Sequence, residues 1–474
     1  MMGLWSRLVP NQAGALWVGL IVTLLVFGDF RRPFSRRNAA LLFLLLLAPL
    51  LVDVLGWSES RARIVFTAVF ALTAAYALWG IILSRRASPA EWRIQLPVPA
   101  LAGLLLGLIV MNVAVTLGRR PDDAGIYTNL GAQRWLETGR LPYGDSLLRG
   151  PEAPAFGAAA TYGPLLYVAH MPAQLALGAA RNPSDADPRD ASYRWPPVAA
   201  TTLTCLGFHL IGLVALLAVV RRDSSLPVAL GAAALWAGSP YLVGLGGDDY
   251  LIGGLRYVSH IAPTAIVLLA FWALGRPIVS GALLAAGAGV LFYPAFMLPA
   301  FLGWHWWKSR RDGLRFAAGF AVVAAVLAVI VIHYTRAPAG QSALGLFVES
   351  TLEHQEGTGS REYGASAIGF WGTHPGLAAF WQKPLFGGTS LFKPTFLLFA
   401  AFAAATFVLA RGRSRPQLAG LVAALGAGVQ LWKTHAQGSY VEWYLPFLLI
   451  ALFAGVTAGG ERGREGNEAA LRAA

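Results

Sequence analysis

The sequence predicts an all-α polytopic membrane protein with about 12–13 transmembrane helices. Of its 474 residues, 56% are hydrophobic and 13% are charged, and the charges are concentrated between long apolar runs. One such run, residues 201–220, carries no formal charge, and a helix of about 20 apolar residues is long enough to cross a hydrocarbon core. Similar runs recur along the chain. Because lipid offers no partners to backbone polar groups, these runs must be helices.

Two further features of the chain bear on its class. The first apolar stretch, near residues 16–27, lacks a strongly basic start and an Ala-x-Ala-like cleavage site, so we expect a retained helix. The single cysteine, Cys205, lies inside a predicted span. One cysteine excludes both a disulfide framework and a thiolate metal site.

The basic residues gather in short connections between apolar runs. The chain has 37 Lys and Arg against 24 Asp and Glu, and connections of this kind face the cytoplasm. We therefore expect a multi-pass protein of the cell's inner (plasma) membrane, without a nucleic-acid partner. The basic connections contain Arg31, Arg32, Arg36, Arg37, Arg85, Arg86, Arg221, Arg222, Lys308, Arg310, Arg311, Arg315, Arg411, Arg413 and Arg415. Most acids fall in the segments expected outside the cytoplasm, 118–195, 246–257, 334–390 and 433–443.

This topology divides the chain into three regions. Residues 1–95 hold additional N-terminal transmembrane helices, residues 96–458 form the main transmembrane module, and residues 459–474 form a cytoplasmic tail. The module carries two large external loops, 118–195 and 334–390. The predicted spans are 13–29, 39–56, 64–84, 96–117, 197–220, 226–245, 258–274, 315–333, 391–410, 416–432 and 441–458.

Two apolar stretches do not fit a simple span. Residues 162–177 would place Arg221 and Arg222 outside if they crossed the membrane, so we interpret them as an interfacial or re-entrant helix. Tyr293-Pro294 splits the stretch between Arg276 and Lys308 into two short apolar pieces. A break at that depth needs protein or a water-filled cavity around it, which predicts a groove open to the outer side.

The segment after the fourth span contains the first candidate site. It reads as an amphipathic helix that begins near Pro121 and ends near Gly139. Asp123 and Tyr127 are four residues apart and therefore share one face. Asp122 and Asp123 are explained equally well as partners of the positive end of the helix dipole. A carboxylate at the rim of a membrane groove would instead accept a proton from a hydroxyl group.

The order of short motifs along residues 100–458 resembles a known family. The motifs are Asp-x-x-x-Tyr (123–127), Thr-Gly-Arg-Leu-Pro-Tyr (138–143), Tyr-Gly-Pro-Leu (162–165), Phe-Tyr-Pro (292–294) and Trp-Tyr-Leu-Pro (443–446). Their order is similar to that in the GT-C superfamily of integral-membrane glycosyltransferases, and especially in the family 87 mannosyltransferases, which use polyprenyl-phosphate sugars. This chain has Tyr-Gly-Pro at 162–164 where such proteins often have Tyr-Pro-Pro.

The resemblance implies transfer of a sugar, mannose-like, from a polyprenyl-phosphate donor to an acceptor hydroxyl on the external face. The acceptor would be a lipid or a glycan, and the reaction would invert the sugar. Asp123 would be the general base, with Asp122 as the reserve candidate. Tyr127 and Tyr293 would lie at the donor. No cofactor is expected.

A second constellation fills the external connection before residue 258. Arg256 or His260 would bind the leaving phosphate, and Asp248 or Asp249 would bind sugar hydroxyls or a cation. An ordinary solvated loop with an Asp–Arg pair is the alternative for the acids. Arg256 lies at a span boundary, where an unpaired cation is costly.

Two more external segments contain polar candidates. His354 would bind phosphate or steer the acceptor, and a divalent metal site of Glu353, His354 and His374 is conceivable but lacks a recognisable ligand spacing. Lys433 or His435 would bind phosphate. The aromatic residues that follow, including Trp443 and Tyr444, are interpreted most simply as an interfacial aromatic belt.

Two other functions remain as alternatives. A lipid-linked sugar transporter or flippase would show two related halves with paired broken helices, and the halves here look unrelated. An O-antigen polymerase or ligase-like enzyme is also built from many spans and a large outer loop. Walker-type phosphate loops, dinucleotide fingerprints and the Gly-x-Ser-x-Gly and His-Glu-x-x-His motifs are missing from the sequence. Cytoplasmic sugar nucleotides are therefore not the expected donor.

Overall fold

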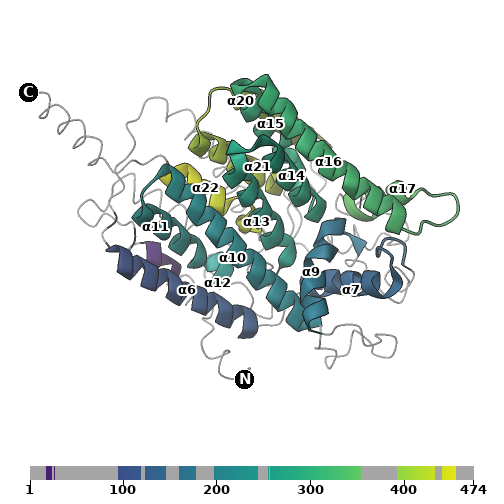
Figure 1. Ribbon diagram of the computed structural model, residues 1–474, viewed down its shortest axis with the longest axis horizontal. Helices are drawn as coiled ribbons and strands as arrows, with labels where there is room; N and C mark the ends of the chain where they lie inside the picture. The colour runs from purple at the N-terminus through teal and green to yellow at the C-terminus, as the bar shows by residue number, and fades with distance from the viewer. Residues whose placement is uncertain are drawn as a thin grey trace, which may run out of the picture.

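The structure, a computed structural model, describes residues 18–23, 26, 94, 96–118, 123–145, 160–177, 197–243, 255, 257–353, 392–432 and 440–454. Within these ranges all regular secondary structure is helical, and the helices pack side by side as a bundle (Figure 1). Four helices in the same ranges are long and apolar enough to cross a membrane. They are Val98–Leu117, Ala199–Asp223, Val258–Gly275 and Arg310–Tyr334. The prediction of an all-α membrane protein is confirmed at this level.

Six helices coincide with predicted spans, because each of them consists mainly of one long apolar run. They are α6 (Val98–Gly118), α10 (Pro197–Asp223), α13 (Val258–Trp272), α16 (Arg310–Tyr334), α20 (Phe392–Leu409) and α21 (Arg415–Trp432). α16 starts before the predicted residue 315, because the Ser309 side chain accepts a hydrogen bond from the backbone N–H of Asp312 at 3.5 Å. Arg310 and Arg311 therefore form part of the helix.

The span predicted over 226–245 is wrong as one continuous helix. α11 (Leu226–Ala237) ends where the N–H of Gly238 donates to the carbonyl of Ala234 at 2.8 Å, and α12 (Pro240–Val243) follows. Pro240 has no N–H with which to continue the helical ladder. The last predicted span likewise divides into η8 (Tyr440–Trp443) and α22 (Leu445–Phe453).

The stretch around Tyr293-Pro294 forms the predicted broken hairpin. α13 is followed by the short η3 (Ala273–Gly275), then α14 (Pro277–Val290), η4 (Tyr293–Met297) and α15 (Leu298–Lys308). At about 1.5 Å per residue the two legs are roughly 21 and 17 Å long, well short of a hydrocarbon core of about 30 Å. α14 packs along α16, and α15 packs between α16 and α20.

The basic connections that the structure describes, after α10 and between α20 and α21, meet at one end of the bundle. Arg415 and Asp223 form an ion pair of 2.9 Å between the start of α21 and the end of α10. Ser224 donates to the carbonyl of Phe453 at 2.7 Å, which brings the end of α22 to the same place. The Trp304 ring N–H donates to the carbonyl of Arg413 at 3.0 Å, which adds the α20–α21 connection.

The opposite end carries short helices from the segments that the sequence predicts to be external. α7 (Asp123–Thr138) and α9 (Pro164–Ala176) lie there against α10 and α13, and α17 (Ala343–Val348) with the π-helical turn η5 (Glu349–Glu353) follows α16. α9 is 13 residues long, shorter than the roughly 20 residues that a transmembrane helix needs, and the interfacial or re-entrant interpretation stays a prediction. The predicted spans 39–56 and 64–84 and the tail 459–474 lie outside the described residues.

Candidate functional site

α7 is the helix predicted to carry the catalytic carboxylate. It begins at Asp123, and it ends before Gly139, whose φ of 66° and N–H bond to the carbonyl of Trp135 at 2.8 Å close the helix. The predicted end at Gly139 is therefore confirmed. The backbone of Asp123 and Tyr127 is described, but the side chains of both, and all of Asp122, lie outside the described residues.

Buried polar contacts hold the first half of α7 in place. The Thr128 hydroxyl lies 3.0 Å from Nε2 of His170 on α9, and Thr201 on α10 donates to the carbonyl of Gly125 at 3.1 Å. All three side chains are buried. Because buried hydrogen bonds are directional and their groups are costly to leave unpaired, they fix the rotation of α7.

Burial lowers the pKa of His170 to about 3, so the ring is neutral in the folded protein. In an unfolded chain a histidine takes up a proton near pH 6.5. The resulting stability is complete above about pH 6.5 and is lost as the pH falls toward 3, by up to about 1.4 kcal/mol per pH unit. We expect the thermal midpoints of wild type and His170→Gln in detergent to converge between about pH 7.5 and pH 5.

His333→Gln supplies the control for this measurement, because His333 is an exposed histidine at the end of α16. Its midpoint is expected to follow that of the wild type across the same pH range. Parallel curves for wild type and His170→Gln would contradict the role of His170.

The motif segments 138–143 and 162–165 contact one another beside α7. The Tyr143 hydroxyl donates to the carbonyl of Tyr162 at 2.5 Å, and the N–H of Leu141 donates to the carbonyl of Tyr334 at 2.8 Å. Burial, reinforced by the neighbouring Tyr167, raises the pKa of Tyr143 well above its ordinary value. The hydroxyl therefore stays protonated and keeps its donor role.

Gly163 joins this pair of segments to the broken hairpin. Its N–H donates to the carbonyl of Val290 at 3.2 Å, and a Cβ at this position would lie 2.1 Å from the carbonyl oxygen of Gly289. A proline here would lose the donor and meet the same carbonyl. The departure from Tyr-Pro-Pro at 162–164 therefore has a local physical reason.

We expect Gly163→Ala to lower the stability of the folded protein by about 3 kcal/mol, because the added methyl group forces α9 away from α14. Gly103→Ala is the matched control, since a Cβ on this α6 glycine meets nothing within 4 Å. Thermal unfolding of the two variants in the same detergent measures the difference. Equal midpoints would show that the close approach of α9 to α14 has no energetic weight.

A buried polar and aromatic cluster lies where α13, η4 and η8 meet; we call it the Glu442 cluster. Every member is at most 3% exposed. It is composed of Tyr257, His260, Thr264, Tyr293, Glu442, Trp443 and Tyr444.

The centre of the cluster is an acid beside an imidazole. Glu442 Oε2 lies 3.9 Å from Nδ1 of His260. The His260 ring stacks on Tyr257 with centroids 4.8 Å apart, and its other side meets Trp443 edge to face at 6.1 Å. Burying a carboxylate is costly without nearby polar partners, so its position here is strongly constrained.

The hairpin turn joins the cluster through Tyr293. Its ring stacks on Trp443 with centroids 4.1 Å apart and an interplanar angle of 12°, and its hydroxyl lies 3.0 Å from the Thr264 hydroxyl. Tyr293 is 0% exposed, so its side chain lies in the protein interior and does not line an open groove as predicted. The aromatic-belt interpretation is wrong for Trp443 and Tyr444, because both are buried by the neighbouring helices.

Of the predicted site residues, the structure brings together His260 and Tyr293, which both contact Trp443. Sequence reasoning missed Glu442 and Thr264 as members of this cluster. The available signal was an acid placed directly before an apolar run, where a carboxylate needs a partner. The remaining candidates lie outside the described residues, either entirely or with their side chains. They are Asp122, Asp123, Tyr127, Asp248, Asp249, Arg256, Glu353, His354, His374, Lys433 and His435.

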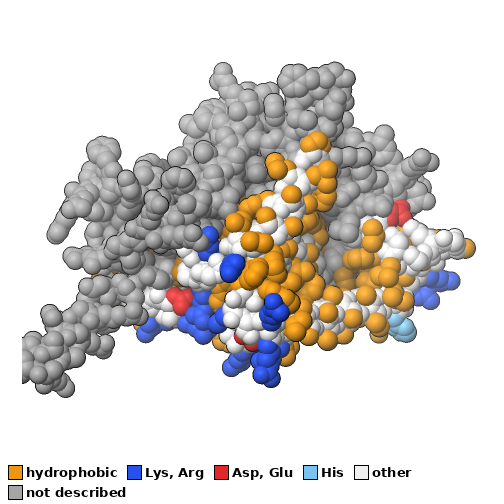
Figure 2. Space-filling view, turned by 90° about the horizontal axis from the view of Figure 1, so that it is seen from above, with side chains coloured by type: hydrophobic (Ala, Val, Ile, Leu, Met, Phe, Trp, Pro, Cys, Tyr) orange, Lys and Arg blue, Asp and Glu red, His pale blue; other side chains and the backbone are white. Residues whose placement is uncertain are grey.

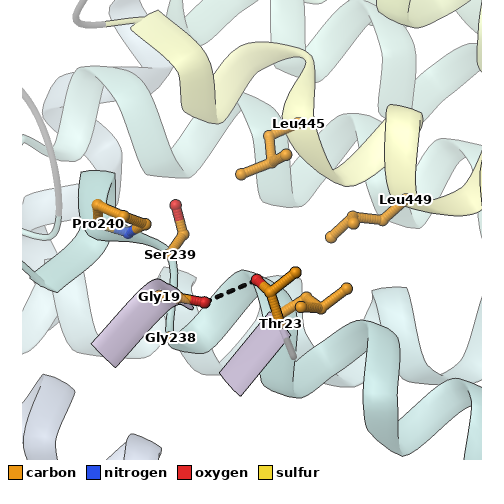
Figure 3. Close-up of a pocket in the computed structure, with 8 residues that line it drawn as sticks. Gly19, Thr23, Gly238, Ser239, Pro240, Leu445 and Leu449 are labelled. Atoms are coloured by element: carbon orange, nitrogen blue, oxygen red, sulfur yellow. Dashed lines mark hydrogen bonds between the residues drawn. The ribbon is translucent and has the colours of Figure 1, made fainter. Parts of the chain in front are cut away.

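Figure 3 shows a small pocket between the helical segment 18–23, the α11–α12 junction and α22. Its volume of about 20 Å³ has room for about one water molecule. The Thr23 hydroxyl inside it donates to the carbonyl of Gly19 at 2.6 Å. None of its lining residues is titratable, so the pocket lacks the groups that proton transfer needs. The lining consists of Gly19, Thr23, Leu235, Gly238, Ser239, Pro240, Leu445 and Leu449.

The fold defines the class of the chain as an all-α membrane protein. In the part of the chain that the structure describes, no three side chains of His, Cys, Asp or Glu form a group that could hold a metal ion. No family model, no curated protein and no solved structure matches the chain.

Proposed function

We propose that the protein is a glycosyltransferase that moves a sugar from a polyprenyl-phosphate donor to an acceptor hydroxyl at the external face of a membrane. One observation supports this most directly: motif segments far apart in the sequence are neighbours in space. Tyr143 contacts residue 162, Gly163 bonds to Val290, and Tyr293 stacks on Trp443. The resemblance to GT-C enzymes rests on these same segments.

The proposed reaction is a single inverting displacement. The acceptor oxygen attacks the anomeric carbon as the Asp123 carboxylate accepts the hydroxyl proton. The bond between the anomeric carbon and the phosphate oxygen breaks, and the polyprenyl phosphate leaves with the electron pair. One feature supports Asp123 in this role: α7, which contains it, packs against α13, the helix that carries His260.

The Glu442 cluster is proposed as the floor of the site, because it holds the start of α13, the hairpin turn and η8 together. Polar groups of the surrounding external segments would then contact the donor phosphate and sugar. The candidates for those contacts are Tyr127, Asp248, Asp249, Arg256, His354, Lys433 and His435, whereas His260 and Tyr293 belong to the buried floor. The proposed location is the inner membrane, with a mannose-like sugar and a lipid or glycan acceptor. The proposal needs no cofactor.

Reconstitution of the full chain tests the proposal. Nanodiscs containing the protein would receive synthetic polyprenyl-phosphate mannose and lipid and glycan extracts from a strain that lacks the protein. We expect mass spectrometry to show one hexose added to an acceptor together with free polyprenyl phosphate. Transfer of a preassembled oligosaccharide would favour a polymerase or ligase, and movement of intact donor between vesicle leaflets would favour a flippase. Either result without single-hexose transfer would overturn the proposal.

A further inference from the structure

A basic and aromatic surface lies at the end of the bundle opposite to the Glu442 cluster. It is formed by the last turn of α15, the first turn of α16 and the α20–α21 connection, and we call it the tryptophan–cation surface. Figure 2 shows Lys and Arg side chains gathered where hydrophobic bands of the bundle meet. The members are Trp304, Trp307, Lys308, Arg310, Arg311, Arg315, Arg411 and Arg413.

Two cations of this surface are held over tryptophan rings. Lys308 Nζ lies 5.0 Å from the centroid of the Trp304 ring, and the Arg411 guanidinium lies 5.0 Å from that of Trp307. The rings are themselves fixed, because Trp304 donates to the carbonyl of Arg413 at 3.0 Å and Trp307 donates to that of Phe407 at 2.8 Å. Both positive charges are therefore positioned before any ligand arrives.

Positive side chains outnumber acids on this surface, within the residues that the structure describes. Six cations lie on it together with one acid, Asp312, which lies 3.6 Å from Arg315. Nearby, Arg415 is neutralised by Asp223 at 2.9 Å. In the part of the chain that the structure describes, Lys308 and Arg411 have no carboxylate within ion-pair distance. A cation on an aromatic ring keeps its charge available to an anion.

Apolar side chains border these cations on the membrane-facing side. Leu314 is 61% exposed, Val408 is 60% exposed and Trp307 is 39% exposed. α20 ends in Val408 and Leu409 just before Arg411, and α16 places Leu314 one turn from Arg310. An occupant that satisfies both features has an anionic head and an apolar body.

We propose that the tryptophan–cation surface binds the headgroup phosphate of an anionic glycerophospholipid, whose acyl chains lie along α16 and α20. Lys308 and Arg411 supply the phosphate contacts, and Trp307 marks the boundary between headgroup and chains. Clusters of cations next to a membrane span recognise anionic lipid in this way. The inference is independent of the glycosyltransferase proposal, because it concerns the other end of the bundle.

Native mass spectrometry of the full chain tests this inference with two probes, phosphatidylglycerol and phosphatidylcholine of identical acyl chains. We expect the wild-type protein to retain phosphatidylglycerol in preference to phosphatidylcholine. The double variant Lys308→Gln/Arg411→Gln is expected to bind it roughly 25-fold more weakly, because each cation near an anionic surface contributes roughly a factor of five. Lys308→Arg/Arg411→Lys, which preserves the charge, should recover most of this loss.

The matched control is Arg140→Gln/Arg336→Gln, which removes two exposed cations from the opposite end of the bundle. Its retention of phosphatidylglycerol should equal that of the wild type. Equal retention of the two lipids by wild type, or an equal loss in both double variants, would overturn the proposal. Displacement of the lipid by millimolar inorganic phosphate would also overturn it, because the site would then be a phosphate site without a role for the chains.

Discussion

Asp123→Asn is expected to lower sugar transfer by about a thousand-fold while leaving the protein folded and able to bind donor. General-base catalysis contributes roughly a hundred- to ten-thousand-fold to a rate, and asparagine retains the shape of aspartate without its basicity. The helix α7 spans Asp123–Thr138, and a carboxylate near a helix N-terminus is in general stabilised by the helix dipole. The single-hexose assay with purified variant measures the rate, and donor binding is followed separately by the retained lipid mass.

The effect of Asp123→Asn depends on whether Asp123 is a partner of the helix dipole or the general base. Glu137→Gln, near the other end of α7, removes a carboxylate that lies 3.6 Å from Arg134 and is expected to leave transfer unchanged. If Asp123→Asn lowers only the thermal midpoint, by the few tenths of a kcal/mol that a dipole contact contributes, Asp123 is a capping residue and not the base. Loss of transfer at an unchanged midpoint identifies the base.

Glu442→Ala is expected to destabilise the folded protein by about 3 kcal/mol, because truncating a fully buried side chain leaves a cavity among packed aromatic rings. The substitution leaves a cavity and removes the acid that faces His260 at 3.9 Å. The cluster joins α13, η4 and η8, because Tyr293 contacts both Thr264 and Trp443 and Glu442 faces His260. Thermal or denaturant unfolding in detergent measures the loss.

Two variants separate the charge of Glu442 from its volume and its burial. Glu442→Gln preserves the volume and should recover much of the stability. Asp312→Ala removes an acid from a partly exposed ion pair of 3.6 Å with Arg315, where the expected change is about 1 kcal/mol or less. Similar losses for Glu442→Ala and Asp312→Ala would contradict a structural role of the buried cluster.

The spans could be predicted from the sequence because hydropathy reports them directly. Long apolar runs gave α10 and α13 nearly to the residue, Pro294 located the broken hairpin, and Gly139 located the end of α7. Each of these features depends on residues that are close together in the sequence. The break at Gly238 was missed because an apolar run that contains glycine and proline also fits a single kinked span.

The site was harder to predict because its geometry depends on contacts between distant segments. His260 and Tyr293 were selected individually, but their common neighbour Trp443 follows Tyr293 by 150 positions in the chain. The residue type alone does not distinguish a tryptophan at a membrane interface from one buried inside the protein. The packing of neighbouring helices determines the location, and it buries Trp443, Tyr444 and Glu442.

The broken hairpin also has a consequence for the lipid around the protein. α14 rises roughly 21 Å from its basic start, while its neighbour α16 rises roughly 37 Å. The turn at η4 therefore stops roughly 9 Å below the level that a helix crossing the full hydrocarbon core would reach. We expect such a height difference between adjacent helices to thin the surrounding leaflet locally. The proposed prenyl-linked donor would then approach the turn through this thinner part of the bilayer.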